Sequence, residues 1–328
     1  PIELRMRSHY EERYGKSFIP KDMTIQDFGV SYEELEPFFD YAEKVFGTSG
    51  QAWTVKGQLV GQGKGGNPYA PDRSNPFPLE AQKNTVSAQL FGKAATEVGY
   101  KPYNLPSANT SGPYTNPYGA QMGPCNFCGF CSGYVCYMYS KASPNVNILP
   151  ALKPLPNFEL RANSHVLRVN LDSSKTKATG VTYIDAQGRE IEQPADLVIL
   201  GAFQLHNVRL MLLSGIGKPY DPISGEGVVG RNFAYQNMAT IKAFFDKDTH
   251  TNNFIGAGGN GVALDDFNAD NFDHGPHGFV GGSPMWVNQA GSRPIAGTSN
   301  PPGTPAWGSA WKRATADYYT HQVSMDAH

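Results

Sequence analysis

The sequence has no cysteine outside residues 125–136, no long apolar run and no run of like charge. A membrane helix needs roughly 18 consecutive apolar residues, and the longest run here is LVILGAF. Charged residues make up only 17% of the chain, and 27 Lys and Arg nearly balance 29 Asp and Glu. These absences argue against a membrane span and against binding to nucleic acid or to an anionic lipid surface.

Apolar residues, glycine and proline are plentiful in the 328-residue chain. Hydrophobic residues make up 40% and aromatic residues 12%, which is enough to bury a sizeable core. The 36 glycines and 25 prolines indicate long irregular loops. We therefore expect a loop-rich α/β or mixed α+β fold. The chain begins at Pro1 and stops at His328 without a closing element, so we expect an internal piece of a longer protein.

Two segments in the first third of the chain predict helices. Ser31 and Glu34 have the spacing of a capping box, apolar residues follow at helical intervals, and Gly47 ends the pattern. The segment 79–99 predicts a second helix that ends at its final glycine. The glycine, proline and asparagine residues between the two segments predict coil.

Short β-type runs dominate the chain after the cysteines. Gln187–Gly188 predicts a hairpin turn between two of these strands. The continuously apolar run 196–202 predicts a strand covered on both faces, and 207–217 predicts a helix ended by glycine. That order indicates an α/β sheet. The other predicted strands are 158–163, 165–172 and 239–246.

The four cysteines form one cluster with the spacing C-x2-C-x2-C-x4-C: Cys125, Cys128, Cys131 and Cys136. Gly129 and Gly133 permit the tight turns that would fold four thiolates around one centre. The nearest pattern is the ferredoxin run C-x2-C-x2-C-x3-C-P, but this chain has an extra residue before the last cysteine and Tyr137 in place of proline. Spacing favours an iron–sulfur cluster; zinc and disulfides or free thiols remain open.

Other motifs lack the context that their chemistry requires. Two stretches match G-x-G-x-x-G, at Gly61, Gly63 and Gly66 and at Gly256, Gly258 and Gly261. Neither stands in a strong strand–turn–helix pattern, so we interpret both as glycine loops. His274 and His277 have metal-ligand spacing, but Gly275 and Pro276 between them break a helix. This pattern favours a solvated loop over a metal site.

Four segments in a fixed order resemble the middle of glucose-methanol-choline (GMC) flavin oxidoreductases: YSKASPNVNILPAL, PNFELRANSHVLRVNLD, GVTYIDAQGREIEQPADLVILGAFQLHNVRLMLLSGIG and GVVGRNFAYQ. With the cysteine cluster, the likeness is to the branch that contains the flavoprotein (large) subunits of gluconate 2-dehydrogenases. The resemblance implies an FAD/NAD(P)-binding-type GMC fold with a substrate domain, incomplete at both ends. It divides the chain into substrate-domain or FAD-covering segments (1–122), an iron–sulfur loop (123–143), part of the FAD-binding domain (144–236) and part of the substrate domain (237–328).

The resemblance also assigns FAD contacts. It places the Val166 backbone at the adenine and Gly201 and Ala202 near the flavin. Phe203 stands where the family has glycine, and Asn207–Val208 stands where it has Ser-Pro. The family's nucleotide-binding glycine turn would precede this chain, and its catalytic histidine pair would lie beyond residue 328, so we assign no catalytic residue.

The same branch holds a three-iron cluster on residues that match Cys125, Cys131 and Cys136. Cys128 is then either the fourth ligand of a four-iron cluster or a spectator. The implied activity is FAD-dependent oxidation of a hydroxyl group of a sugar acid or polyol, with electrons passing through the cluster to a cytochrome c subunit.

The resemblance further implies a small subunit and a peripheral position on the periplasmic side of the bacterial inner membrane. From the residues alone, the alternatives are a non-catalytic iron–sulfur electron carrier and a zinc-stapled ligand-binding protein.

Overall fold

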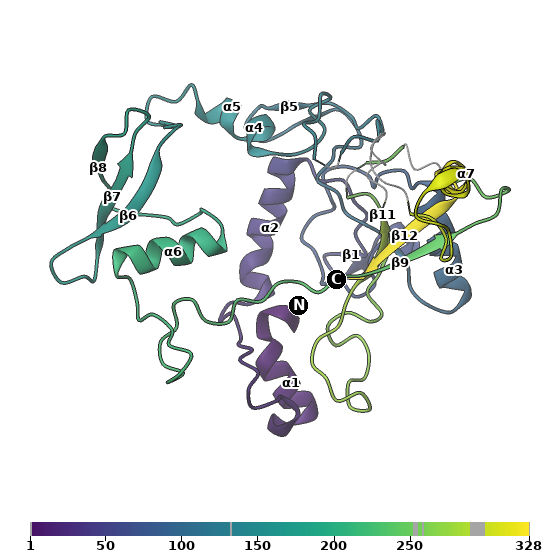
Figure 1. The fold of residues 1–328 in the computed structure, drawn as a ribbon, viewed down its shortest axis with the longest axis horizontal. Coiled ribbons are helices and arrows are strands. Elements are labelled where there is room, and N and C mark those ends of the chain that lie inside the picture. The colour runs from purple at the N-terminus through teal and green to yellow at the C-terminus, as the bar shows by residue number, and fades with distance from the viewer. Residues whose placement is uncertain (1, 132, 252–254, 258, 289–298, 328) are drawn as a thin grey trace. The chain divides into compact units, whose positions relative to one another are not determined.

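The chain divides into two compact units, Pro1–Leu155 with Gln236–His328, and Pro156–Tyr235 (Figure 1). The computed structural model describes residues 2–131, 133–251, 255–257, 259–288 and 299–327. The finer division expected from the sequence, with boundaries after residues 122, 143 and 236, stays a prediction. No helix in the described ranges combines the length and the apolar character needed to cross a bilayer.

The first unit contains six α-helices among its described residues, and two of them were expected. Its helical elements are η1 (Ile2–Arg5), α1 (Met6–Tyr14), η2 (Lys16–Phe18), α2 (Tyr32–Phe46), η3 (Gly61–Gly63), α3 (Val86–Glu97), α4 (Pro144–Asn147), α5 (Leu149–Leu152) and α7 (Gly308–Tyr318). Helix α2 confirms the predicted capping box. The Ser31 hydroxyl accepts a hydrogen bond from the Glu34 amide at 3.2 Å, and the Glu34 carboxylate accepts one from the Ser31 amide at 2.7 Å. Gly47 ends the helix with φ +63°, as expected for a left-handed C-cap.

Helix α3 begins later than its sequence pattern predicts. Its helical residues start at Val86, whereas the prediction began at residue 79. Leu79 is engaged elsewhere, because its amide donates to the Thr48 carbonyl at 3.2 Å and its carbonyl accepts from the Gly50 amide at 3.0 Å. Pairing with residues distant in sequence therefore overrides the local helical pattern at this end.

An antiparallel sheet of five strands organises the first unit. The strand order is β3-β10-β11-β12-β9, and Figure 1 shows β9, β11 and β12 side by side. The strands are β3 (Tyr103–Asn104), β10 (Gly261–Leu264), β11 (Met285–Asn288), β12 (Gln322–Ala327) and β9 (Ala239–Phe244), the last of which was predicted. Two further pairs of short strands are β1 (Thr54–Val55) with β2 (Gln58–Leu59) and β4 (Tyr114–Thr115) with β5 (Gln121–Met122).

The main apolar core lies between α3 and this sheet. Ala88 of α3 packs against Val262 of β10 and Val287 of β11, and all three are at least 95% buried. Phe91 and Val323 pack around them as partly buried neighbours. Each fully buried aliphatic side chain contributes roughly 1.5–3 kcal/mol relative to an exposed one, so this cluster fixes α3 on the sheet.

A polar network ties α1 to the segment after β10. The Asp270 carboxylate, whose side chain is 3% exposed, accepts hydrogen bonds from His9 (2.5 Å), Arg13 (2.5 Å) and Tyr14 (2.8 Å). Burial raises the pKa of Asp270, but these three donors outweigh it and the net pKa is lowered. The ionised form therefore stabilises the folded state above the unfolded-state pKa, and this contribution is lost as the pH falls through the folded-state pKa.

The second unit is a three-stranded antiparallel sheet with one helix. Its elements are β6 (His165–Leu171), β7 (Ala178–Ile184), β8 (Glu190–Pro194) and α6 (Gln204–Ser214). The hairpin predicted at Gln187–Gly188 is confirmed, because Ile184 pairs with Glu190 and Gly188 has φ +78°. The Ser214 hydroxyl accepts a hydrogen bond from the Val169 amide at 2.8 Å, which fastens the end of α6 to β6.

Two runs predicted as strands are not strands. Residues 158–163 and 196–202 form coil, and Leu197 and Ile199 are 76% and 82% exposed. An apolar strand covered on both faces needs neighbouring strands and covering layers. Within residues 156–235, all of which the structure describes, the sheet consists of β6, β7 and β8, and residues 196–202 pair with none of these strands.

The turn into α6 places a bulky residue in a glycine-type conformation. Phe203 has φ +69° and ψ 153°, a region that essentially only glycine occupies without strain. The Asn207 side chain holds this turn, since its oxygen accepts from the Ala202 amide at 2.9 Å and its amide donates to the Leu200 carbonyl at 3.2 Å. The turn therefore holds Phe203 in a conformation that suits glycine, the residue that the family resemblance implies at this position.

Replacing Phe203 by glycine is expected to stabilise the protein. The side chain is 63% exposed, so little packing is lost, and relief of backbone strain should raise the free energy of unfolding by about 1 kcal/mol. Urea unfolding measures the effect, and Phe203→Ala is the matched control, because alanine removes the ring but retains the strain. Greater stability of Phe203→Ala than of Phe203→Gly would show that the conformation is not strained, because glycine otherwise destabilises the folded state relative to alanine.

Candidate functional site

The cysteine loop is closed at its base by two buried hydroxyl residues. The Thr110 hydroxyl donates to the Gly123 carbonyl at 2.6 Å, and the Thr110 carbonyl accepts from the Cys125 amide at 2.8 Å. At the other end of the loop, the Thr110 amide donates to the Ser140 carbonyl at 3.1 Å, and the Ser140 hydroxyl donates back to the Thr110 carbonyl at 3.1 Å. Thr110 thus joins the beginning and the end of the loop.

Tight turns fold the chain between the cysteines. Gly129 and Gly133 have φ +79° and +81°, as the sequence predicts for a loop that turns between its thiols. Gly123 is also constrained, because a Cβ there would lie 2.5 Å from the Met138 carbonyl oxygen. The Gly256 amide donates to the Phe127 carbonyl at 3.4 Å, so one side of the loop rests on a distant segment.

All four cysteines are free thiols, and the charges of two of them act on a third. Cys131 is buried, whereas Cys125, Cys128 and Cys136 are partly exposed. Burial raises the pKa of the Cys125 thiol, and repulsion from the thiolate charges of Cys131 and Cys136 raises it further, against lowering by hydrogen bonds. These are the three thiols that the family resemblance implies as cluster ligands. The ligand role of each cysteine stays a prediction.

The four thiols are chemically suitable ligands for an iron–sulfur cluster, but they are not arranged around one metal position. In the described part of the chain, no group of three or more His, Cys, Asp or Glu side chains is arranged to hold a metal ion. Reduced thiols within one turn-rich loop are nevertheless the ligands that iron–sulfur clusters use. Metal binding commonly completes the folding of such loops, and the binding of a cluster by this loop stays a prediction.

Two residues that the sequence did not connect with the cysteines, Asn109 and Lys141, contact Cys131. Asn109 and Lys141 pair in an isolated antiparallel bridge. The Asn109 side-chain amide points to Cys131 Sγ at 3.9 Å, and Lys141 Nζ donates to the carbonyls of Cys131 (2.6 Å) and Tyr134 (3.3 Å). No spacing rule identifies them, because their role depends on a fold contact between segments 32 residues apart.

The residues implied as FAD contacts all lie in the second unit. Val166 is in β6, where it pairs with Tyr183. Gly201 and Ala202 are exposed in the coil before α6, and a Cβ on Gly201 would meet nothing within 4 Å. An exposed backbone that leads into a helix start can accept a cofactor, because the first amides of a helix have no partners within it. The contacts themselves stay predictions.

The glycine-rich stretch at Gly61, Gly63 and Gly66 is a structural loop. Gly61 and Gly63 lie in the short 3-10 turn η3, and the next described α-helix begins only at Val86. A Cβ on Gly66 would lie 2.7 Å from the Ala52 carbonyl oxygen, so close packing requires glycine there. In the second stretch, Gly258 lies outside the described residues.

The expectation of a solvated histidine loop is wrong for His274. The side chain is fully buried, with Nε2 2.6 Å from the Ala269 carbonyl oxygen and Nδ1 2.9 Å from the Phe279 carbonyl oxygen. The Tyr10 hydroxyl lies 3.0 Å from Nε2. His277, in contrast, is exposed. The sequence could not predict this burial, because Tyr10 lies 264 residues away.

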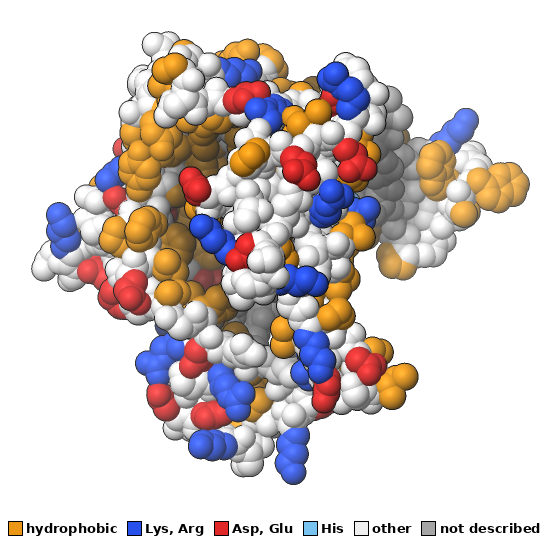
Figure 2. Space-filling view, turned by 90° about the vertical axis from the view of Figure 1, so that its left-hand side faces the viewer, with side chains coloured by type: hydrophobic (Ala, Val, Ile, Leu, Met, Phe, Trp, Pro, Cys, Tyr) orange, Lys and Arg blue, Asp and Glu red, His pale blue; other side chains and the backbone are white. Residues whose placement is uncertain are grey.

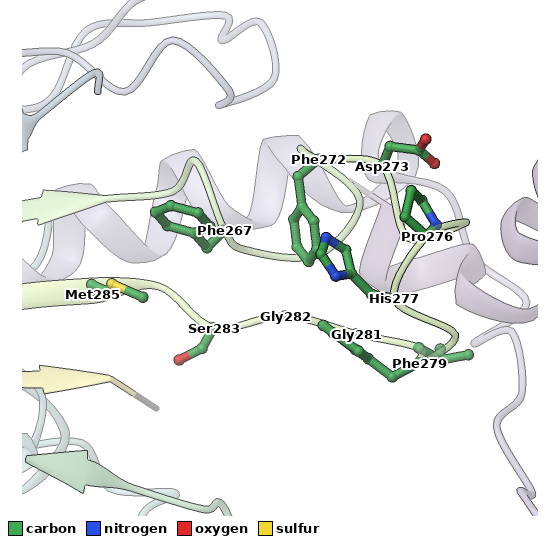
Figure 3. A pocket seen from close by; sticks show the side chains of 11 residues that line it. Phe267, Phe272, Asp273, Pro276, His277, Phe279, Gly281, Gly282, Ser283 and Met285 are labelled. Atoms are coloured by element: carbon green, nitrogen blue, oxygen red, sulfur yellow. The ribbon is translucent and has the colours of Figure 1, made fainter. Parts of the chain in front are cut away.

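A pocket of about 810 Å³ lies next to this histidine. Most of its lining is apolar, and Figure 3 shows the rings of Phe267 and Phe272 and the side chain of Met285 along it. A polyhydroxylated acid needs several polar partners in its site, so we do not assign a substrate of that kind to this pocket.

Figure 2 shows Lys and Arg side chains interspersed with Asp and Glu, in line with the nearly balanced charge.

Comparison with known proteins identifies the family. A family model described as GMC oxidoreductase matches residues 26–238. The chain is 75% identical over all 328 residues to the gluconate 2-dehydrogenase flavoprotein of Pantoea cypripedii, of which it spans 53%. It is 27% identical over 216 residues to the paromamine 6'-oxidase of Streptomyces fradiae (65% of this chain, 35% of that protein). It is 23% identical over 223 residues to the fructose dehydrogenase large subunit of Gluconobacter japonicus (66% of this chain, 37% of that protein).

The chain spans about half the length of the gluconate 2-dehydrogenase flavoprotein and less of the other two proteins. The family match covers more than half of the chain, including the cysteine loop and the whole second unit. The mixed helix and strand architecture agrees with the fold class that the sequence predicts. The chain therefore belongs to the GMC oxidoreductase family.

Proposed function

We propose that the protein containing this chain is an FAD-dependent dehydrogenase that oxidises a hydroxyl group of a sugar acid such as gluconate, or of a related polyol. The observation that carries this proposal is the 75% identity to a gluconate 2-dehydrogenase flavoprotein over the whole chain. GMC oxidoreductases bind FAD, which supplies a hydride acceptor for the carbon that bears the hydroxyl group. This chain would contribute walls of the cofactor site through Val166, Gly201 and Ala202.

We further propose that the cysteine loop holds an iron–sulfur cluster that relays electrons one at a time to a cytochrome c subunit. Reduced flavin gives up two electrons and a haem accepts one, so a one-electron centre between them has a clear purpose. Support comes from four free thiols in one loop and from the charge repulsion that Cys131 and Cys136 exert on Cys125. Thr110, Ser140 and the loop glycines would hold the ligands in place.

The surface beside the loop supports an acceptor subunit at this position. Several large apolar side chains are exposed within the loop: Phe130, Tyr134, Val135, Tyr137 and Tyr139. Aromatic residues are enriched at protein interfaces. We propose that they contact the cytochrome c subunit, and that a small subunit completes a complex bound peripherally to the periplasmic side of the inner membrane.

Cofactor content tests this proposal directly. The full-length protein, purified anaerobically, is expected to contain iron and acid-labile sulfide and to release FAD on denaturation, because thiolates and the FAD-binding fold retain both groups. Metal analysis and absorbance spectra measure them. Zinc without flavin would contradict the proposal, and iron without flavin would favour a non-catalytic electron carrier.

Replacing single cysteines separates the relay from the flavin chemistry. In the complex with cytochrome c, Cys131→Ser is expected to abolish cytochrome reduction while gluconate still reduces the flavin, because only the relay has lost a ligand. Cys128→Ser is the matched variant, and it should keep cytochrome reduction if three cysteines suffice. Stopped-flow absorbance follows both steps, and normal cytochrome reduction in Cys131→Ser would rule out the relay.

A further inference from the structure

We propose that Asn109 and Lys141 are positioning residues that fix Cys131 within the cysteine loop and adjust the electrostatic environment of its thiolate. The proposal rests on the proposed function, because a ligand role for Cys131 gives the fixed thiol its purpose. It goes further, because it gives two residues outside the cysteine motif a role. They keep the loop ordered, and they contribute to the redox potential of the proposed cluster.

Both residues reach Cys131 from one short bridge. Asn109 and Lys141 are antiparallel partners, so their side chains start from neighbouring points of the backbone. The Asn109 amide nitrogen lies 3.9 Å from Cys131 Sγ, and Lys141 Nζ donates to the Cys131 carbonyl at 2.6 Å. Asn109 therefore lies at the sulfur of Cys131, and its side chain also forms a hydrogen bond with Cys125. Lys141 contacts the backbone of Cys131.

Lys141 also joins two positions of the loop. Its ammonium donates to the carbonyl of Tyr134 at 3.3 Å as well as to that of Cys131. The carbonyls of a turn-rich loop need partners to stay ordered, and a charged donor gives a stronger hydrogen bond than a neutral one. Lys141 thus restrains the half of the loop that follows the buried thiol.

Asn109 is itself held firmly. Asn109 is almost fully buried, and its backbone carbonyl accepts hydrogen bonds from the Ser49 hydroxyl (2.8 Å) and the Gln82 side-chain amide (2.7 Å). The backbone amide of Asn109 donates to the Ser107 hydroxyl at 3.2 Å. These bonds fix the backbone of Asn109, from which its side chain reaches the sulfur of Cys131. Residues that support metal ligands are commonly held by further hydrogen bonds in this way.

The charge of Lys141 has a predictable effect on the centre. Reduction of a thiolate-bound cluster adds negative charge, and a nearby ammonium stabilises that charge. Lys141 should therefore raise the reduction potential of the cluster. The Asn109 hydrogen bond to sulfur acts in the same direction, because it withdraws electron density from the thiolate.

Thiol alkylation in the cluster-free, full-length protein tests the positioning role. The rate at which iodoacetamide modifies each cysteine is measured by mass spectrometry over a range of pH, which gives the rate constant of the thiolate itself and removes the effect of a changed thiolate fraction. Lys141→Met should raise the rate at Cys131 by about tenfold or more, since a hydrogen bond from a charged donor is worth that much in a local opening equilibrium. The rate at Cys128, whose neighbour Phe127 rests on Gly256, should stay unchanged.

Two control variants complete the alkylation experiment. Lys141→Arg should restore the slow wild-type rate, because arginine keeps the charge and the donors. Lys153→Met removes an equal charge at an exposed position outside the loop and should have no effect. An unchanged Cys131 rate in Lys141→Met would overturn the proposal. A second variant repeats the test. It is Asn109→Leu if that variant folds and Lys141→Gln if it does not, and either should also raise the alkylation rate of Cys131.

A redox titration of the iron-loaded protein followed by EPR gives the second readout. Lys141→Met should shift the midpoint potential of the cluster to a more negative value, whereas Lys153→Met should not, and identical potentials would overturn the electrostatic part. If the wild-type protein takes up no cluster, the proposed electron relay fails, but the alkylation rates still decide whether Lys141 positions Cys131. The two failures can therefore be distinguished.

Discussion

The hydrogen bonds between Thr110 and Ser140 are the constraint on which the candidate site depends. Both side chains are fully buried, and together they connect the start of the cysteine loop to its end. Without this closure, the two ends of a segment rich in glycine and exposed aromatic residues would not be joined to each other. Removing a partner from such a buried pair costs about 1–3 kcal/mol, because the remaining polar group is left without a hydrogen bond. Thr110 and Ser140, which are not ligand candidates themselves, therefore determine where the segment with the four thiols begins and ends.

Separate elements of the chain have different roles in the candidate site. Thr110 and Ser140 set the ends of the loop, the glycines set its turns, and Asn109 with Lys141 holds the buried thiol. The proposed FAD contacts lie in the second unit, on β6 and before α6. An enzyme that removes two electrons from a substrate and delivers them singly needs both kinds of site. Membership of the GMC oxidoreductase family accounts for the flavin part, and the cysteine loop adds the proposed relay.

Local sequence signals predicted the elements whose stability is local. The capping box of α2 and the hairpin at Gln187–Gly188 were predicted correctly, because adjacent residues determine them. The apolar run 196–202 was predicted wrongly as a strand, because a strand depends on neighbours that the described second unit does not provide. The burial of His274 and the hydrogen bond from Lys141 to the Cys131 carbonyl also could not be predicted. Each depends on a contact that only the folded chain creates.

An anaerobic reductive titration of the full-length flavoprotein subunit, free of its cytochrome partner, tests the central claim most directly. The claim is that this chain carries a one-electron centre in addition to the flavin of the complete protein. Titration with dithionite, followed by absorbance, counts the electrons that the protein accepts per FAD. The account predicts about three, two on the flavin and one on the cluster. An uptake of only about two electrons, with no change in absorbance beyond that of the flavin, would contradict it.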